Sequence, residues 1–136
     1  MAILKPTFTL TSAAASGGIS EDAALALSVS DELTVTDPSI THGKVACTVT
    51  GNETIILPDL DTTRYVYIKN TGLDASDETT TATIKVEIAN NTRIINLDTD
   101  EFCFFPHKAE NSGLIQLEAS SGTVVADYGY WTKYTS

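Results

Sequence analysis

The sequence predicts an all-β protein: an antiparallel β-sandwich of jelly-roll type with a flexible N-terminal arm. Three observations support this prediction. Short segments in which polar and apolar residues alternate recur along the whole chain. Turn-forming residues separate these segments at intervals of roughly 8 to 15 residues. Almost no segment has the periodicity of a helix, so many short strands joined by turns are expected.

The clearest strand lies within residues 63–72. Side chains alternate strictly from Tyr65 to Lys69, so Val66 and Ile68 share one face and the tyrosines share the other. An Asn-Thr-Gly turn then ends the strand. Because both faces are suited to partial burial, we expect this strand to be central in its sheet.

The N-terminal residues are expected to form an arm. Residues 7–11 alternate threonine with Phe8 and Leu10, which is typical of a short edge strand. Residues 12–18 contain only Ser, Ala and Gly, which bury little surface and gain little from ordering. We therefore divide the chain into an arm with the first strand, residues 1–18, and a single β-sandwich domain, residues 19–136.

Further strands are expected after the arm. Residues 20–36 fit either a short capped helix or two strands, and the alternation of small and branched residues favours strands. A Gly-Asn pair separates residues 44–50 from residues 53–57, which predicts a β-hairpin between these two segments. The remaining strands are expected at 81–88, 92–97, 101–106, 114–119 and 123–132.

Composition excludes several classes of partner. The 136 residues include 18 Asp and Glu but only 8 Lys and Arg, so the net charge is -10. Such a surface repels phosphate backbones, and we expect no nucleic-acid partner. No apolar stretch is long enough to span a membrane, and no signal-peptide pattern begins the chain. We therefore expect no membrane partner and synthesis in a cytoplasm, with Cys47 and Cys103 as buried free thiols.

No reaction centre is apparent. The histidines, His42 and His107, are expected in loops, and no nucleophile motif lies beside either one. Together with the two cysteines they lack the paired spacing of a zinc site. The acidic segments 74–78 and 98–101 lack the glycine and spacing of an EF-hand, so solvated turns are favoured over a calcium site. We expect no cofactor and no enzyme, and a hydrolase with paired carboxylates is an alternative without specific support.

Aromatic residues offer a second alternative. They could form a carbohydrate-binding face, although packing in the core or at a subunit interface is favoured for most of them. The residues concerned are Tyr65, Tyr67, Tyr128, Tyr130, Trp131 and Tyr134.

Three segments together resemble small virion proteins of tailed bacteriophages. They are Tyr-Val-Tyr-Ile-Lys-Asn-Thr-Gly at 65–72, Asp-Glu-Phe-Cys-Phe-Phe-Pro at 100–106, and Asp-Tyr-Gly-Tyr-Trp-Thr-Lys-Tyr at 127–134. In the family, a strand ending in a Lys-Asn-Thr-Gly turn is followed by an aromatic strand ending in proline and by a closing aromatic strand. The resemblance covers the C-terminal half of the chain.

The resemblance implies a jelly-roll-like module that acts by assembly. We expect a capsid decoration or cement protein, located on the capsid surface of a virion, that binds the major capsid protein and other copies of itself as a homotrimer. The alternative is a tail or fibre module that binds carbohydrate on the host surface. The expected capsid-contacting residues are Ile3, Leu4, Phe8 and Leu10, and the expected subunit-interface residues are Tyr128, Tyr130 and Trp131.

Overall fold

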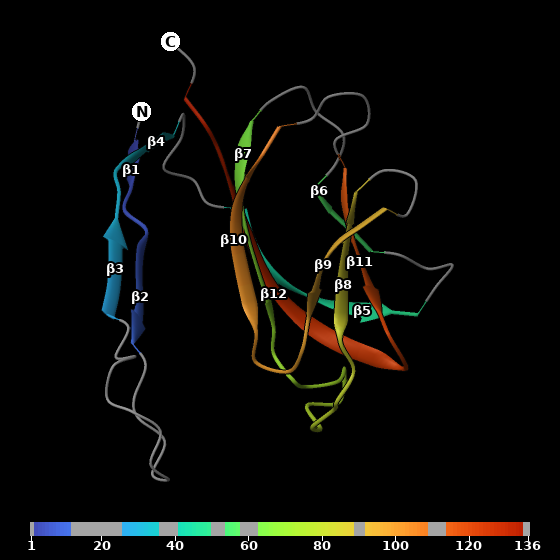
Figure 1. Cartoon of the computed structure of the whole chain (residues 1–136). Helices are drawn as coiled ribbons and strands as arrows, with labels where there is room; N and C mark the ends of the chain where they lie inside the picture. The colour runs from blue at the N-terminus through green and yellow to red at the C-terminus, as the bar shows by residue number, and fades with distance from the viewer. Residues whose placement is uncertain are drawn as a thin grey trace, which may run out of the picture.

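A computed structural model of the chain describes residues 2–11, 26–35, 41–49, 54–57, 63–88, 92–108 and 114–134. All regular secondary structure in these residues is β-strand (Figure 1). The strands are β1 (Ala2–Leu4), β2 (Thr7–Thr11), β3 (Ala26–Ser30), β4 (Leu33–Val35), β5 (Thr41–Thr48), β6 (Thr54–Leu57), β7 (Arg64–Asn70), β8 (Ile84–Ile88), β9 (Thr92–Leu97), β10 (Phe102–His107), β11 (Ile115–Ala119) and β12 (Thr123–Thr132). The described residues contain no helix that is long and apolar enough to cross a membrane.

Two four-stranded sheets form the body of the molecule, which confirms the expected antiparallel β-sandwich. Their strand orders are β10-β7-β12-β5 and β6-β11-β8-β9, and every pairing is antiparallel. From β5 to β12, consecutive strands lie in alternate sheets, except for β8 and β9, which pair directly. The core between the sheets contains Cys47, Leu57, Val66, Ile68, Ile84, Val86, Leu97, Ile115, Leu117 and Val124.

Strand β7 is central, as its sequence predicts, because it lies between β10 and β12. Val66 and Ile68 point into the core and are fully buried. Tyr65, Tyr67 and Lys69 occupy the opposite face, where Tyr65 is also buried. Both faces of the strand are therefore covered, at least in part.

The hairpin expected between residues 44–50 and 53–57 is wrong. Strand β5 pairs with β12, and β6 pairs with β11 in the other sheet. Crossing between sheets buries Cys47 of β5 and Leu57 of β6 on opposite walls of one core, whereas a hairpin would place both strands in the same wall. The Thr54 hydroxyl still donates to the carbonyl of Ala46 at 3.5 Å. The Gly-Asn pair lies outside the described residues.

The first four strands form a two-stranded ribbon beside β10 (Figure 1). Ala2 pairs with Val35, and Thr11 pairs with Ala26, and both strand pairs keep the same register on either side of the break at residues 5–6 and 31–32. Between the two strand pairs, Lys5 forms an ion pair with Glu32 at 2.5 Å. The strands expected within 20–36 are thus confirmed. The proposed division at residue 18 falls outside the described residues and stays a prediction, although β3 and β4 on its far side pair with β1 and β2.

The ribbon joins the sandwich at one end. Val35 of β4 forms a bridge with Lys133, just beyond β12. The backbone N–H of Tyr134 donates to the carbonyl of Thr34 at 3.0 Å. These contacts hold the ribbon next to the outer surface of the sheet that contains β10.

Candidate functional site

The outer surface of the β10-β7-β12-β5 sheet carries a group of aromatic side chains. Alternation places Tyr65 and Tyr67 of β7 on this surface, and the register sets Trp131 of β12 opposite Tyr65 and Phe104 of β10 opposite Tyr67. Phe102 lies two residues before Phe104 on the same side of β10. We call these five residues the aromatic face.

The rings of the aromatic face pack against one another. Phe104 stacks on Tyr65 with a centroid separation of 6.1 Å, and its centroid lies 6.4 Å from that of Trp131. Tyr67 and Phe102 are 6.3 Å apart. These distances fall in the range of favourable aromatic pairs. Packing covers Tyr65 but leaves Phe102 54% and Phe104 38% exposed, so the face stays open along β10.

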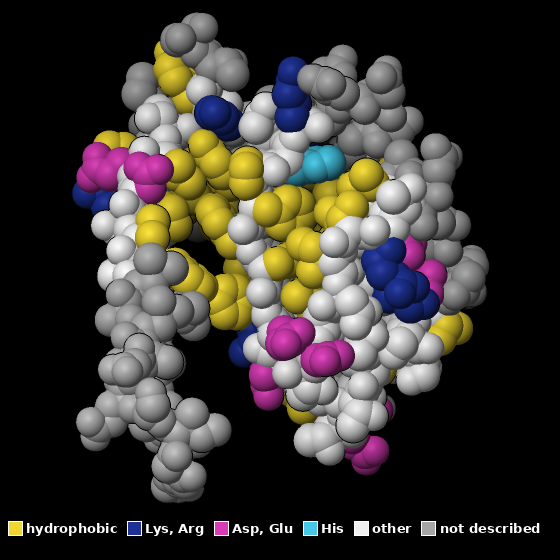
Figure 2. All heavy atoms as spheres, in the orientation of Figure 1, with side chains coloured by type: hydrophobic (Ala, Val, Ile, Leu, Met, Phe, Trp, Pro, Cys, Tyr) yellow, Lys and Arg dark blue, Asp and Glu magenta, His cyan; other side chains and the backbone are white. Residues whose placement is uncertain are grey.

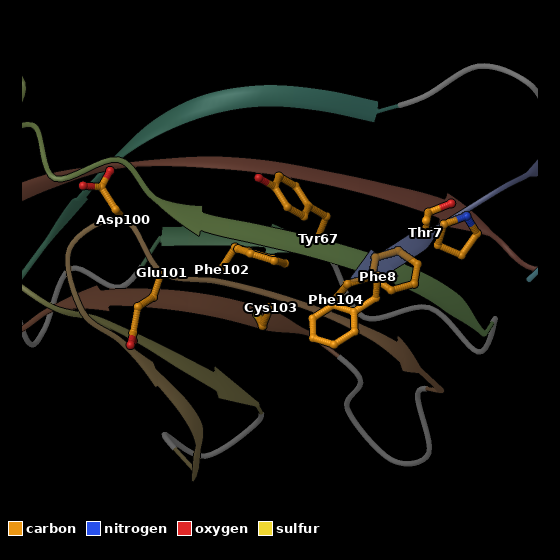
Figure 3. A pocket seen from close by; sticks show the side chains of 9 residues that line it. Thr7, Phe8, Tyr67, Asp100, Glu101, Phe102, Cys103 and Phe104 are labelled. Carbon is orange, nitrogen blue, oxygen red and sulfur yellow. The ribbon is translucent and has the colours of Figure 1, made fainter. Parts of the chain in front are cut away.

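An open cavity of about 830 Å³ lies between the aromatic face and the ribbon. Pro6, Thr7 and Phe8 line its ribbon side, while Tyr67 and residues 100–104 line the sheet side. Figure 2 shows hydrophobic side chains gathered around this hollow. In Figure 3, Asp100 and Glu101 lie at the end of the cavity away from Thr7 and Phe8. The volume is within the range of small-molecule sites and of grooves that accept a side-chain cluster.

Two ion pairs between described residues lie at the edges of the aromatic face. Lys69 Nζ lies 4.0 Å from Asp100 Oδ1, and Lys44 Nζ lies 3.9 Å from Asp127 Oδ1. Burial raises the pKa of the Tyr67 hydroxyl, and the nearby Asp127 carboxylate raises this pKa further. Tyr67 is therefore a neutral phenol near pH 7, able both to donate and to accept a hydrogen bond.

The two cysteines lie far apart and are unreactive. Cys47 is on β5 and Cys103 is on β10, at opposite edges of the same sheet. Three interstrand spacings separate these edges, or about 14 Å, which is too far for a disulfide. Burial raises the pKa of Cys47 to about 12 and that of Cys103 to about 11. Both are therefore neutral thiols at physiological pH and poor nucleophiles.

Both histidines lie in strands, which corrects the expectation that they occupy loops. His42 is within β5, which starts earlier than predicted because it pairs along almost the whole length of β12. His107 ends β10, opposite Arg64. The histidines are on opposite edges of the sheet and do not converge. In the described part of the chain, no three His, Cys, Asp or Glu side chains are grouped as metal ligands would be.

The residues expected to contact a capsid lie on the ribbon but not on one surface. Ile3 is 57% exposed, and strand alternation sets it on the face opposite Leu4 and Phe8. Leu10 belongs to β2, but its side chain lies outside the described atoms. Ile3 and Leu4 therefore face opposite sides of the ribbon, and the role of the set stays a prediction.

The expected subunit-interface residues are also divided between two surfaces. Tyr128 and Tyr130 pack against the core, and the guanidinium of Arg64 lies 5.5 Å from the centre of the Tyr130 ring. Trp131 alone belongs to the aromatic face. Sequence reasoning missed Phe102 and Phe104 as site residues. Their alternation showed that they share a side of β10, but not that this side points outward.

Comparison with known proteins adds no relative. No family model, no curated protein and no solved structure matches the chain.

Proposed function

We propose that this protein is a bacteriophage virion component, a capsid decoration or cement protein that binds the outer capsid surface and other copies of itself. One observation carries the proposal. The three segments that resemble phage virion proteins fold as the neighbouring strands β10, β7 and β12, and the outer surface of these strands is the aromatic face. The shared motif thus builds a surface suited to protein contacts, without a converging reaction centre in the described residues.

The connectivity supports an assembly role. The strand orders β10-β7-β12-β5 and β6-β11-β8-β9 support the expected jelly-roll-like winding of the antiparallel β-sandwich. Viral capsid proteins and lectins use this architecture widely. This support is an analogy between folds, so the surface chemistry must carry the functional assignment.

The exposed chemistry is that of a binding surface. Phe102 and Phe104 on the sheet and Phe8 on the ribbon expose large apolar areas together. Aromatic side chains are enriched in the buried centres of protein interfaces, and each buried Å² of apolar surface contributes about 25 cal/mol. The major capsid protein and further copies of this chain are the proposed partners, with a homotrimer as the proposed oligomer.

The direct test is to locate the protein in particles. Purified virions from an infection with a phage encoding this chain are examined by mass spectrometry and by electron cryomicroscopy. Purified protein is also added to capsids that lack it, and binding is followed by cosedimentation and by the temperature at which the capsids rupture. The proposal predicts density on the outer shell and a higher rupture temperature. Absence from virions, together with no cosedimentation, overturns it.

A second candidate function is recognition of host carbohydrate by a tail or fibre module. The cavity favours it, because Tyr67 and Phe102 offer ring surfaces and Asp100 and Glu101 offer hydrogen-bond acceptors at one end. A glycan array compares the wild type with Tyr67→Ala and with Ile94→Ala, an exposed apolar control on β9. Binding lost only in Tyr67→Ala supports this function, and no binding by the wild type argues against it.

A further inference from the structure

The cavity between the ribbon and the aromatic face has aromatic side chains on both of its walls. Phe8 of the ribbon is 46% exposed, and Phe102 and Phe104 of β10 are 54% and 38% exposed, although all three line the cavity. One chain therefore supplies both walls of a space of about 830 Å³. Small-molecule sites in proteins have this size and this predominantly apolar lining.

One end of the cavity is acidic. Asp100 and Glu101 lie at this end, away from Phe8 (Figure 3). The backbone N–H of Asp98 donates to Glu101 Oε2 at 2.8 Å, which orients this carboxylate without removing its charge. Lys69 Nζ lies 4.0 Å from Asp100 Oδ1, so two carboxylates face one ammonium. One negative charge is therefore left at this end of the cavity.

The rest of the lining is uncharged. Among the described residues that line the cavity, none is Lys, Arg or His, and Asp100 and Glu101 are the charged ones. An anionic ligand would be repelled at the acidic end. A cation would be attracted there, and the net charge of -10 on the whole chain raises the local concentration of cations further.

Strand β10 sets the order of these groups along the cavity. Glu101 directly precedes β10, while Phe102 and Phe104 lie on the same side of it. Three steps along an extended chain separate residues 101 and 104, which is about 10 Å. A ring that packs between Phe8 and Phe104 can therefore reach the acidic end with a short alkyl chain. Phe102 lies between the two positions, and aromatic rings attract cations.

We propose that this cavity binds a small organic cation, in which a flat apolar ring is joined to one ammonium group by a short alkyl chain. The ring packs against Phe8 and Phe104, and the ammonium group faces Glu101. A neutral sugar fits less well, because the two phenylalanine walls offer no partner to its hydroxyl groups. A folded partner is too large to enter between these walls, because the ribbon stands beside β10 (Figure 1). The inference goes beyond the proposed function and does not depend on it.

Three indole compounds of similar size and different charge test the class of ligand. At pH 7 tryptamine is a cation, tryptophol is neutral and indole-3-propionate is an anion. Methyl glucoside is the sugar control. Binding to the whole chain is measured by isothermal titration calorimetry, and the site is located by NMR from the shifts of backbone amides.

The proposal predicts an order of affinity. Tryptamine should bind with a Kd of about 1 mM or below, which suits a ligand of its size. Indole-3-propionate should bind at least about tenfold more weakly, with tryptophol between the two. Amide shifts should gather at residues 100–104 and at Phe8. Raising the salt concentration from about 0.05 M to about 0.5 M should weaken tryptamine more than tryptophol.

Substitutions separate the acidic end from the apolar walls. Glu101→Gln keeps an acceptor for the Asp98 N–H but removes the charge, so tryptamine affinity should fall about fivefold while tryptophol affinity stays unchanged. Glu78→Gln is the matched control, because Glu78 is an exposed acid outside the cavity lining. Phe104→Ala should weaken all three indoles about tenfold, whereas Ile94→Ala, an exposed apolar position on β9, should weaken none.

Several results overturn the inference. They are no tryptamine binding by the wild type, equal affinity for the three indoles, preference for methyl glucoside, and tryptamine binding that survives both Glu101→Gln and Phe104→Ala. Circular dichroism checks that each variant is folded, and Phe102→Ala replaces Phe104→Ala if the latter does not fold.

Capsid cosedimentation of the same variants keeps this inference apart from the proposed function. Tryptamine binding without capsid binding overturns only the proposed function. Capsid binding that is lost in Glu101→Gln and Phe104→Ala, without tryptamine binding by the wild type, assigns the cavity to the capsid contact and overturns only this inference.

Discussion

Replacing Asn70 should destabilise the sandwich more than any exposed substitution, because its side chain joins the two sheets. Asn70 ends β7 and is fully buried. Its Nδ2 donates to the carbonyl of Ala82 at 3.0 Å and to the carbonyl of Leu97 at 3.1 Å. Ala82 lies just before β8, and Leu97 is the last residue of β9, so both carbonyls belong to the opposite sheet. Its Oδ1 accepts from the N–H of Gly72 at 2.9 Å.

The expected loss of unfolding free energy follows from the buried polar groups that lose their hydrogen-bond partner. Asn70→Ala leaves two carbonyls and one N–H buried without these partners. Each such group costs about 1–2 kcal/mol, so the free energy of unfolding should fall by about 3–6 kcal/mol. The whole stability of a chain of this length is about 7–20 kcal/mol. The variant should therefore unfold at a markedly lower denaturant concentration.

The stability of Asn70→Asp as a function of pH tests the same hydrogen-bond geometry. The introduced carboxyl faces two carbonyl oxygens in a buried site, so its pKa in the folded state should lie above its pKa in the unfolded state. A raised folded pKa means that stability is present at low pH and is lost as pH rises through that pKa. Relative to wild type, this variant should therefore be less stable at pH 7 than at pH 4.

Urea unfolding, followed by the fluorescence of Trp131 and by circular dichroism, measures both variants. Asn96→Ala is the control, because Asn96 is an exposed asparagine on β9 that accepts one hydrogen bond from Thr83. Its effect should stay within about 0.5 kcal/mol. An Asn70→Ala loss below about 1 kcal/mol would refute the bridging role.

Three other predictions follow from single positions. Gly72→Ala should destabilise the fold by about 1 kcal/mol or more, since φ is 69° and an added Cβ would lie 2.5 Å from Thr99 Cγ2; an unchanged unfolding midpoint would contradict this. The unfolded Cys47 thiol ionises near pH 9.0 but the folded one only near 12, so Cys47 should lower the wild-type stability as pH rises above 9, by about 1.4 kcal/mol at pH 10, and Cys47→Ala should remove this part of the pH dependence and leave the part that is due to Cys103, in unfolding measured across this range. Ile68→Ala should cost about 2–5 kcal/mol of stability without changing solution mass while the protein is folded, whereas Tyr67→Ala should weaken association with a smaller loss of stability. Equal effects of these two substitutions on both measurements would contradict the assignment of their faces.

The strands could be predicted from the sequence because their signal is local. The alternation in β7 and the polar turn after it reveal a covered strand without any knowledge of its neighbours. Which of the two sheets a strand joins depends on residues that are far away in the sequence. The Gly-Asn pair between β5 and β6 favours a hairpin, yet the energy gained by burying Cys47 and Leu57 across the core places the two strands in different sheets.

The ribbon was harder to predict for the same reason. Residues 7–11 alternate threonine with apolar side chains, a pattern that fits many partners equally well. Pairing with residues 26–30 requires two segments that are well separated in the sequence to meet, and no residue in either segment specifies that meeting. The aromatic face posed a different difficulty. Both sides of β10 are apolar, with Phe102 and Phe104 on one and Cys103 and Phe105 on the other, so alternation alone does not identify the outer side.

The neighbouring strand resolves that ambiguity and links stability to the proposed function. The register aligns Cys103 and Phe105 with the buried Ile68 and Val66, so Phe102 and Phe104 must face outward beside Tyr67. The inward-facing side chains of β7 contribute to the core, and the last of them is Asn70. The outward-facing tyrosines of the same strand contribute to the aromatic face. Because the two sets alternate along one backbone, the core holds the contact surface rigid, and association between copies need not order it at a cost in entropy.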